Sequence, residues 1–445
     1  MLEKNSAKID STASKKEIHA WAMYDWGNSA FAATVVTAFL GPYMASLIAA
    51  QPGGVLHLFG FEIQPDAFYP FCVSASVIMQ VVFLPILGTL ADYTALKKRL
   101  MLMFAYIGAV ATMLLFFLQG NTIVFGGLLF IIANLSFGAA LVFYNAFLPE
   151  LAGPGDHDSV SSKGFAYGYV GGGLLLGINL LLISIMEDKA LAARISLGSA
   201  GLWWFTFTFL FPQRHLKERT PAKTLPTGSN YFAFSLREFW ATLVEMKNRY
   251  PRTLLYLIAY LVYNDGIQTV NTVAATFITQ EIGLDLAVVL QILLMIQFVA
   301  AIGAMFFNKI AEYIGAKYTI ILNLSIWCGV VIYAYGFLYN EFDSWILGFM
   351  IAMVLGSSQA LSRSLFAQMI PHNKEAAYFS LYEISERGTS WVGPIVFGLG
   401  VQMTGNSRIA LLMIIAFFIF GIVMLYVTDV RRAIIDAGHE APELV

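Results

Sequence analysis

The chain has 445 residues, of which 58% are hydrophobic and only 12% are charged, and its formal net charge is -2. Soluble globular domains carry about a quarter of their residues as Asp, Glu, Lys and Arg, so this composition excludes an ordinary soluble enzyme. A nearly neutral chain also has no basic field to attract nucleic acid. We therefore expect no nucleic-acid partner.

Apolar runs long enough to cross a bilayer recur along almost the whole chain. A transmembrane helix needs about 20 mostly apolar residues. The first run follows a polar N-terminal tail and is too long to be the apolar region of a signal peptide. We therefore predict an all-α integral membrane protein with twelve transmembrane helices and a retained first helix. The predicted spans are 20–48, 68–91, 99–119, 122–148, 164–186, 190–211, 252–279, 286–311, 317–339, 345–370, 375–402 and 407–428.

Basic residues are distributed unevenly between the two predicted sides of the membrane. If the N-terminus is cytoplasmic, 21 of the 26 Lys and Arg residues lie in cytoplasmic segments, whereas only Lys189, Arg194 and Arg408 lie on the other side. Lys and Arg concentrate in the cytoplasmic loops of membrane proteins. The asymmetry predicts that both termini are cytoplasmic, and the short loops favour a bacterial inner membrane.

A polar and basic segment divides the chain near its middle. It contains the helix-breaking residues Pro221, Pro226 and Gly228, and residues 234–247 can form an amphipathic surface helix. The division predicts five parts, which are an N-terminal tail at 1–19, a six-helix bundle at 20–211, a central cytoplasmic loop at 212–251, a second six-helix bundle at 252–428 and a C-terminal tail at 429–445.

The two predicted bundles share short sequence patterns at corresponding places. The segment 88–93, followed by Lys97, matches the segment 308–313, followed by Lys317, at an offset of 220 residues. In each bundle this segment joins the second and third spans. The pattern indicates an internal duplication, a common building rule of secondary transporters, and it predicts two pseudo-symmetric halves.

The first of these segments resembles the hallmark loop of the major facilitator superfamily. It reads Gly88-x-x-x-Asp92 and precedes a basic cluster that begins at Lys97, although Tyr93 stands where the family has its first basic residue. The resemblance implies the major facilitator fold and a cytoplasmic latch whose charge pairs form and break during transport. The residues that we assign to this conformational gate are Gly88, Asp92, Lys97, Lys98, Glu312 and Lys317.

Three further segments are similar to a narrower branch, the vacuole-effluxer-like family, which is named for a yeast vacuolar protein linked to autophagy and amino-acid export. They are Trp21-Ala-Met-Tyr-Asp-Trp-Gly-Asn28, Tyr144-Asn-Ala-Phe-Leu-Pro149 and Tyr263-Asn-Asp-Gly-Ile-Gln268. The resemblance covers essentially the whole chain. It implies a transporter fold, cytoplasmic ends and amino-acid export, and it places Asn145 among the candidate binding residues.

Several predicted spans contain charged residues, which cost at least about 2.5–3.5 kcal/mol at membrane depth and therefore need a partner or a water-filled cavity. In the seventh span, Asp265 and Gln268 share one helical face. We expect Asp265 either to contact solute or a proton or to be held in a structural pair. In the first span, Asp25 and Asn28 share a face, and Asp25 either acts in gating at the cytoplasmic side or binds solute.

Two later spans contain further charges. Arg363 in the tenth span can bind a substrate carboxylate through two hydrogen bonds, or it can neutralise Asp265 or an acid of the eleventh span. In the eleventh span, Glu383 and Arg387 lie four residues apart and can pair with each other. This pairing leaves Glu386 as a candidate proton carrier.

Patterns for catalysis and cofactor binding do not occur in the sequence. The six histidines are spread over tails and loops without metal-ligand spacing. The glycine-rich motifs that bind dinucleotides or nucleotide phosphates are also missing. We therefore predict no catalytic residues, no metal site and no cofactor.

Together these patterns predict a secondary active transporter or facilitator that works by alternating access of two helix bundles. Its expected partners are the lipid bilayer and a small polar solute, with a co-transported or counter-transported proton, and we expect a monomer. Amino-acid export is the activity that the resemblance implies. The alternative is a polytopic membrane enzyme or a lipid-handling protein that moves no soluble solute.

Overall fold

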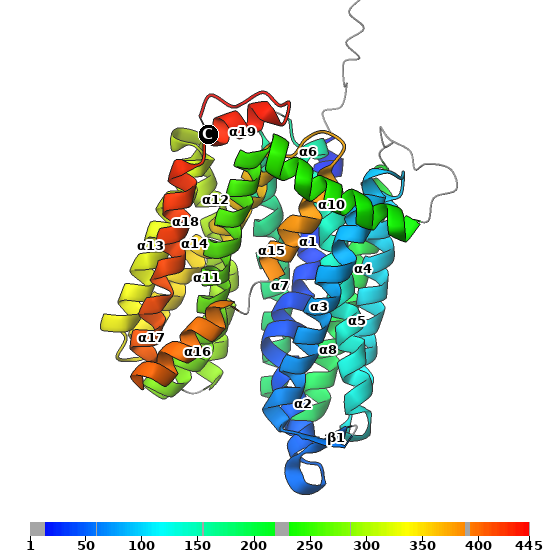
Figure 1. The fold of residues 1–445 in the computed structure, drawn as a ribbon. Coiled ribbons are helices and arrows are strands. Elements are labelled where there is room, and N and C mark those ends of the chain that lie inside the picture. Colours follow the sequence, from blue (N-terminus) through cyan, green and yellow to red (C-terminus); the bar gives the residue numbers. More distant parts are fainter. Residues whose placement is uncertain are drawn as a thin grey trace, which may run out of the picture.

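The computed structural model describes residues 14–58, 60–153, 155–218, 231–284, 286–387 and 392–444. This part of the chain is almost entirely helical, and its two strands, β1 (Leu56–Leu58) and β2 (Phe61–Ile63), form one antiparallel hairpin. Figure 1 shows the long helices in two groups that lie side by side. The predicted all-α fold is confirmed.

The N-terminal bundle contains the helices that precede the central loop. They are α1 (Lys15–Ala30), η1 (Phe31–Phe39), α2 (Leu40–Ala49), η2 (Pro52–Gly54), α3 (Pro65–Asp92), α4 (Lys97–Leu114), η3 (Leu115–Phe117), η4 (Gly120–Thr122), α5 (Ile123–Ala146), α6 (Leu148–Leu151), α7 (His157–Ile185), α8 (Lys189–Leu210) and α9 (Pro212–His215).

The remaining helices form the C-terminal bundle and the segments attached to it. They are α10 (Tyr231–Arg249), α11 (Pro251–Ile282), α12 (Leu286–Ile314), α13 (Ala316–Gly336), α14 (Glu341–Gln368), α15 (Glu375–Arg387), α16 (Val392–Thr404), α17 (Ser407–Met413), α18 (Ile415–Val427) and α19 (Val430–Asp436).

Ten helical segments among the described residues are long and apolar enough to cross a membrane, and each overlaps one of the predicted spans. The predicted seventh span corresponds to α11, and the predicted eleventh span corresponds to α15 followed by α16. For these two segments, membrane crossing stays a prediction.

The first span is not the uniform α-helix that its sequence predicts. A nine-residue π-helix, η1, lies between α1 and α2 and continues them without a break. π-Helical turns are rare and frequently occur at functional sites. In this protein η1 lies against the cavity described below, so the irregular segment faces the space between the bundles.

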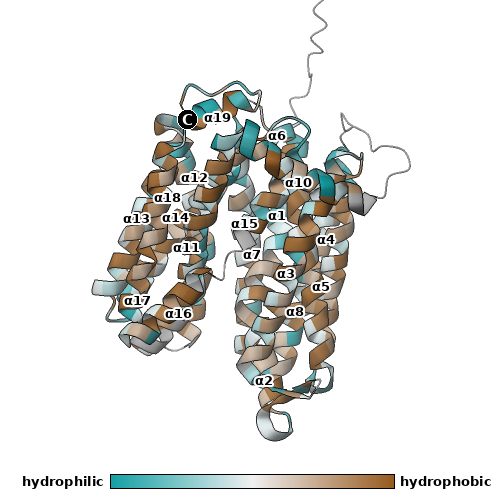
Figure 2. Cartoon of the chain, viewed as in Figure 1, coloured by the Kyte–Doolittle hydropathy of each residue, from teal (hydrophilic) through white to brown (hydrophobic). Residues whose placement is uncertain are grey.

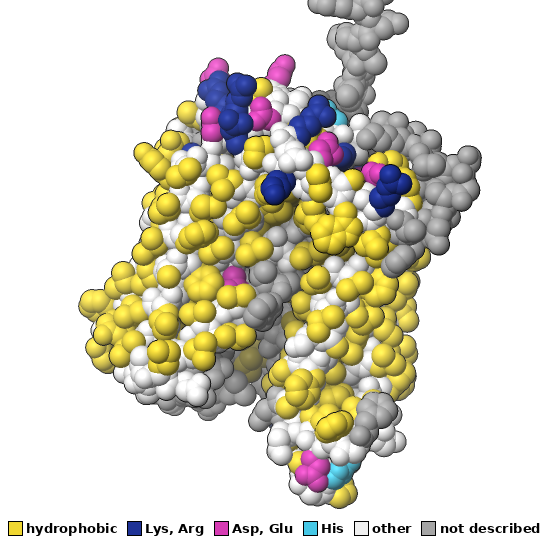
Figure 3. All heavy atoms as spheres, viewed as in Figure 1, with side chains coloured by type: hydrophobic (Ala, Val, Ile, Leu, Met, Phe, Trp, Pro, Cys, Tyr) yellow, Lys and Arg dark blue, Asp and Glu magenta, His cyan; other side chains and the backbone are white. Residues whose placement is uncertain are grey.

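Polar residues gather at the ends of the molecule. Figure 2 shows hydrophilic residues concentrated in α10 and α19, and we call the end that carries these two helices the α10 end. In Figure 3 hydrophobic side chains cover the middle of the visible face, whereas Lys, Arg, Asp and Glu side chains lie mainly at the α10 end. This distribution suits a protein whose middle is surrounded by lipid.

The predicted amphipathic surface helix corresponds to α10, which runs across the ends of the long helices (Figure 1). The hydroxyl of Tyr93, directly after α3, donates a hydrogen bond to Glu238 of α10 at 2.8 Å. Lys374, directly before α15, forms an ion pair with Glu245 of α10. The helix therefore contacts both bundles at this end.

A glycine-rich stretch of α7 packs closely against α1. A methyl group on Gly171 would overlap the backbone carbonyl oxygen of Trp26, so a residue with a side chain cannot take this position without moving a helix. Small residues allow this kind of close approach between membrane helices. The packing fixes α1 and α7 relative to each other, and both helices line the cavity.

Among the described residues, the main contacts between the two bundles are those of α7 with α12 and α14, and those of α15 with α3 and α5. Figure 1 shows that the bundles are close at the α10 end and diverge toward the end that carries β1. Figure 3 shows a hollow between the halves that widens toward this opposite end. In the part of the chain that the structure describes, the two bundles are therefore in contact at the α10 end and farther apart at the other end on this face.

Candidate solute-binding site

A cavity of about 230 Å³ lies between the two bundles. The N-terminal bundle contributes residues of α1, η1, α5 and α7 to its wall, and the C-terminal bundle contributes residues of α12, α14 and α15. Its charged lining residues are Asp25, Arg363 and Glu383. The other polar lining residues are Asn28, Ser29, Thr37, Asn145, Tyr169, Gln297, Gln359 and Tyr382.

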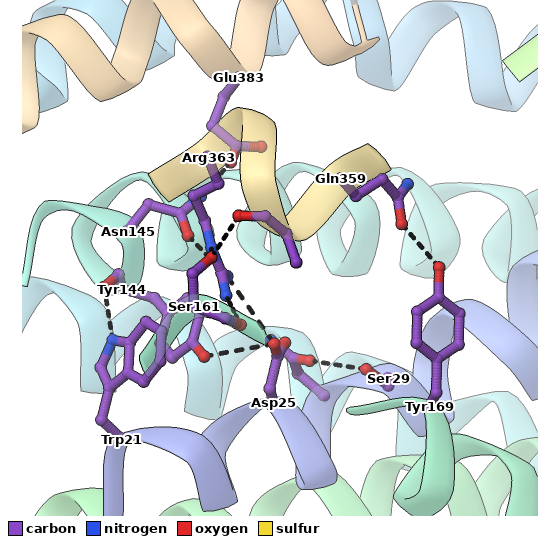
Figure 4. A network of polar contacts seen from close by, with 12 residues as sticks. Trp21, Asp25, Ser29, Tyr144, Asn145, Ser161, Tyr169, Gln359, Arg363 and Glu383 are labelled. Carbon is purple, nitrogen blue, oxygen red and sulfur yellow. Dashed lines mark hydrogen bonds and ion pairs between the residues drawn. The ribbon is translucent and has the colours of Figure 1, made fainter. Parts of the chain in front are cut away.

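Arg363 of α14 joins the two bundles at this cavity (Figure 4). Its Nε donates to the hydroxyl of Ser161 at 3.0 Å, and its Nη2 donates to the carbonyl oxygen of the same residue at 2.8 Å. Its Nη1 donates to Oδ1 of Asn145 at 3.2 Å and lies 3.8 Å from a carboxylate oxygen of Asp25. Every one of these partners belongs to the N-terminal bundle.

Aromatic rings surround the guanidinium of Arg363. Its central carbon lies 4.2 Å from the ring centre of Phe165, 5.0 Å from Trp21 and 5.5 Å from Tyr144. Trp21 and Tyr144 stack on each other with 4.4 Å between ring centres. A cation in contact with aromatic faces is stabilised most where it is shielded from water, and Arg363 is only 2% exposed.

Hydrogen bonds connect both carboxylates of the cavity to the same cluster. The hydroxyl of Tyr144 donates to Asp25 at 3.2 Å, and Nδ2 of Asn145 donates to Glu383 at 2.6 Å. Asn145 therefore bridges Arg363 and Glu383, because its oxygen accepts from one and its nitrogen donates to the other. In their ionised forms Asp25, Glu383 and Arg363 carry one net negative charge.

The structure brings together four of the seven candidate binding residues. Asp25, Asn28, Asn145 and Arg363 all line the cavity. Arg363 pairs with Asp25 of the first span and not with Asp265. The side chain of the candidate proton carrier Glu386 lies outside the described residues.

Asp265 and Gln268 are not among the residues that line the cavity. Asp265 is 2% exposed, and its Oδ2 accepts the backbone N–H of Gly393, near the start of α16, at 2.7 Å. Its Oδ1 has no hydrogen-bond partner among the described residues. Gln268 is half-buried and Thr272 is exposed, so the polar face of α11 extends from a buried carboxylate to an accessible surface.

Asp92 at the end of α3 caps the first turn of α15 in the opposite bundle. Its two carboxylate oxygens accept the backbone N–H groups of Ala376 at 2.9 Å and Ala377 at 2.8 Å. Gly88, one turn earlier, lies directly against the same helix, and a Cβ atom at this position would come within 2.8 Å of Cβ of Ser380. These contacts form an inter-bundle latch at the α10 end.

Lys97 and Tyr93 lie beside this latch. Lys97, at the start of α4, forms a 2.7 Å ion pair with Glu150 of α6 and is 5% exposed. Tyr93 occupies the position at which the superfamily loop has a basic residue, and its hydroxyl binds Glu238 of α10. Burial, together with this hydrogen bond, raises the pKa of Tyr93, so the hydroxyl remains a donor at neutral pH.

Three of the predicted gate residues make contacts within their own bundle or its loops. Nζ of Lys98 donates to the carbonyl oxygen of Gln213 at 2.9 Å, and Lys317 donates to the carbonyl oxygens of Tyr426 and Thr428 at the end of α18. Glu312 is exposed, and among the described residues it accepts one long, 3.4 Å hydrogen bond, from Asn308. The duplicated motif is therefore asymmetric, because Asp92 caps a helix of the other bundle and Glu312 does not.

Three polar residues of the cavity wall, and Ser161 beside Arg363, do not stand out in the sequence. Ser161, Tyr169, Gln297 and Gln359 are neutral polar residues within long apolar helices, and such residues are too common to stand out. Tyr169 and Gln359 form a 2.6 Å hydrogen bond between the bundles. A search for polar residues that share a helical face with Arg363 would have found Gln359, which lies four residues earlier.

Comparison with known families identifies the chain. The family model described as "Vacuole effluxer Atg22 like" matches residues 13–438. The chain belongs to this family. The MFS-type transporter YxiO of Bacillus subtilis is 30% identical over 416 residues, which cover 92% of this chain and 94% of the relative. Autophagy-related protein 22-1 of Aspergillus niger is 25% identical over 562 residues, which cover 97% and 91%.

The fold of this Atg22-like chain also matches solved transporters of the major facilitator superfamily. FucP, a fucose:proton symporter of E. coli, was solved in an outward conformation. That structure matches with a TM-score of 0.68 at 11% sequence identity, covering 93% of this chain and 98% of FucP. The predicted resemblance to the superfamily and to its vacuole-effluxer-like branch is confirmed.

Proposed function

We propose that this chain is a secondary transporter that carries a small zwitterionic solute, an amino acid, by alternating access of its two bundles. The observation that supports this proposal most directly is the cavity of about 230 Å³ whose wall contains charged side chains of both bundles. Pockets for drug-sized ligands are about 300–1,000 Å³, so this smaller cavity suits a solute of a few heavy atoms.

The charges of the cavity suit a molecule that carries both an ammonium and a carboxylate. Arg363 has five N–H donors, of which three donate in the bonds to Ser161 and Asn145. Guanidinium groups recognise carboxylates through paired hydrogen bonds, so a solute carboxylate can bind Arg363 in exchange for its present partners. The net negative charge of the cluster favours an ammonium group near Asp25 or Glu383.

The mechanism follows from the contacts that close the α10 end. Solute reaches the cavity from the opposite, open end while the latch between Asp92 and α15 is formed. For release at the α10 end, the bonds from Asp92 to α15 and from Arg363 to the N-terminal bundle must break. In the predicted topology the α10 end is cytoplasmic, so the present conformation faces outward. Export then begins when solute binds to the opposite conformation, which is open at the α10 end.

Counterflow in liposomes tests this proposal. Purified protein in vesicles preloaded with one unlabelled amino acid should accumulate the same labelled amino acid, and a panel of amino acids, sugars and nucleosides should identify the class. Asp25→Asn should reduce the rate at least about tenfold, whereas Glu62→Gln, which removes a carboxylate from the exposed strand β2, should not. Counterflow of a sugar or nucleoside without any amino acid would overturn the proposed substrate class.

A further inference from the structure

A second, larger cavity forms a groove on the surface between α7 and α12, separate from the solute cavity. It encloses about 1030 Å³. The wall from α12 includes the large apolar residues Phe298, Ile302, Met305 and Phe306, which are 37%, 63%, 46% and 50% exposed. Because α7 belongs to one bundle and α12 to the other, the groove crosses the boundary between the bundles.

Two lysines are the charged residues of this groove among those that the structure describes. Lys163 lies in the second turn of α7, and Lys309 lies in the second-last turn of α12. Both therefore stand toward the α10 end. Neither has a carboxylate within ion-pair distance among the described residues, and Lys163 only contacts the ring of Tyr167 at 5.7 Å.

The carboxylates nearest in sequence have other partners. Asp158, in the first turn of α7, accepts a hydrogen bond from Ser364 of α14. Glu312, one turn after Lys309, accepts from Asn308. Asp158 and Glu312 keep their charges near this end of the groove, but neither forms an ion pair with Lys163 or Lys309 among the described residues. Two ammonium groups at one end of an apolar groove attract an anion with a hydrophobic body.

We propose that this groove binds an anionic phospholipid from the leaflet at the α10 end. An acyl chain lies along the apolar wall, and the phosphate faces Lys163 and Lys309. Basic pockets between transmembrane helices on the cytoplasmic side bind anionic headgroups in this way. The described lining of the groove is mainly apolar apart from the two lysines, whereas a solute site has convergent polar groups, and this difference favours a lipid over a second solute site.

A lipid in this groove would contact both bundles at once. Lys163 moves with α7 and Lys309 moves with α12, so an anion between them must change its contacts when the bundles rock. Bound lipid would therefore stabilise the conformation in which the α10 end is closed. Binding itself involves no solute, so its test does not depend on the proposed amino-acid transport.

Native mass spectrometry of the detergent-purified chain, titrated with palmitoyl-oleoyl phosphatidylglycerol, measures this binding. The wild type should bind it at least about tenfold more tightly than palmitoyl-oleoyl phosphatidylcholine, whose own ammonium neutralises the phosphate. Lys163→Gln with Lys309→Gln should weaken phosphatidylglycerol binding about fivefold for each lysine removed, which corresponds to about 1 kcal/mol per basic residue at an anionic headgroup.

A matched control removes two charges from the same end. Lys15 and Lys16 are exposed at the start of α1, and Lys15→Gln with Lys16→Gln should leave the affinity unchanged. Ile302→Trp should fill the groove and weaken binding, whereas Ile332→Trp, on the exposed face of α13, should not. Inorganic phosphate should not displace the lipid, because it cannot cover the apolar wall.

Three results would overturn the proposal. One is equal affinity of the wild type and the Lys163/Lys309 double variant for phosphatidylglycerol. Another is equal affinity of the wild type for phosphatidylcholine and phosphatidylglycerol. The third is displacement of bound lipid by inorganic phosphate, which would reduce the groove to an anion site.

Discussion

Asp92 and Ala376 belong to different bundles, yet the Asp92 carboxylate accepts the backbone N–H of Ala376 at 2.9 Å. Ala376 is the second residue of α15, so the carboxylate lies at the positive end of that helix and satisfies N–H groups that have no partner within it. The contact exists only while the α10 ends of the two bundles are together. It is therefore a bond that the transport cycle must break and remake.

Replacing Asp92 by Asn should weaken this closed state. An amide keeps one acceptor oxygen but presents an NH2 group to the second backbone N–H, and it loses the charge that favours the helix terminus. Hydrogen bonds to charged groups contribute about 1.5–3 kcal/mol, so the closed-to-open ratio should fall about tenfold or more. Spin-label distances across the α10 end and transport in liposomes measure the two effects at equal amounts of inserted protein.

Glu312→Gln is the matched control for Asp92→Asn, because Glu312 holds the corresponding place in the other half. Its side chain is exposed and accepts one long hydrogen bond within the described part of the chain, so its loss should impair transport less. An unchanged transport rate in Asp92→Asn, or equal losses in both variants, would contradict the role of Asp92 as the latch.

Gly88→Ala should also open the α10 end, for a steric reason. A methyl group at Gly88 would overlap the carbonyl oxygen of Ala376, and the rigid backbone of α15 can only move away. We expect greater thiol labelling of cysteines placed at the α10 end. Gly329→Ala is the matched control, because a Cβ at Gly329 meets no atom within 4 Å, and its labelling should equal that of the wild type.

Composition and periodicity were sufficient to predict the helical membrane fold, because each apolar run must satisfy its backbone hydrogen bonds within a helix. The family segments contain the candidates Asp25 and Asn145, and a charge at membrane depth identified Arg363. They did not indicate that these three residues contact one another, because the contact joins helices more than 100 residues apart in sequence. Such pairings depend on how the two bundles dock, which hydrophobic patterns do not encode.

The duplicated motif shows a second limit of sequence reasoning. Residues 88–93 and 308–313 are alike in sequence, which predicts equivalent latches. In this structure Asp92 binds a helix terminus of the other bundle, whereas Glu312 binds Asn308 of its own helix. The repeat therefore predicts equivalent positions, but not equivalent interactions.

Asp25 and Arg363 should show strong energetic coupling. Breaking a buried ion pair by removing one partner costs about 3–5 kcal/mol, because the remaining charge is buried without compensation. Arg363→Gln should therefore lower the melting temperature sharply, and Arg363→Gln with Asp25→Asn should be less destabilised than the sum of the single variants. A double-mutant cycle in detergent measures this, and contacting pairs show coupling of about 0.5–3 kcal/mol.

The control cycle pairs Arg363→Gln with Glu62→Gln, whose carboxylate is exposed on β2. These two changes should add without coupling. Additive behaviour of the Asp25 and Arg363 variants would mean that the 3.8 Å contact contributes nothing and that Ser161 and Asn145 alone hold the guanidinium.

The carboxylate of Asp265 is buried outside the solute cavity, so replacing it tests a role separate from that of Arg363. One oxygen accepts the N–H of Gly393 and the other has no hydrogen-bond partner among the described residues. Asp265→Asn preserves an acceptor for Gly393 and removes the charge, so folding and insertion should persist. Burying a carboxylate at membrane depth costs free energy, and an amide would suffice for a purely structural hydrogen bond. A carboxylate at this position is therefore better explained by proton or cation binding than by a structural role. We therefore expect transport to fall strongly.

The pH profile of transport distinguishes the two roles of Asp265. If the carboxylate carries a proton, Asp265→Asn should lose the pH dependence of transport between about pH 5 and pH 8, a range over which a buried carboxyl group can titrate. If it binds an ammonium group, the affinity for solute should fall while the pH dependence persists. Glu62→Gln should alter neither property. Normal rate and affinity of Asp265→Asn at every pH would make Asp265 a scaffold residue, and Glu386 would be the next carboxylate to replace.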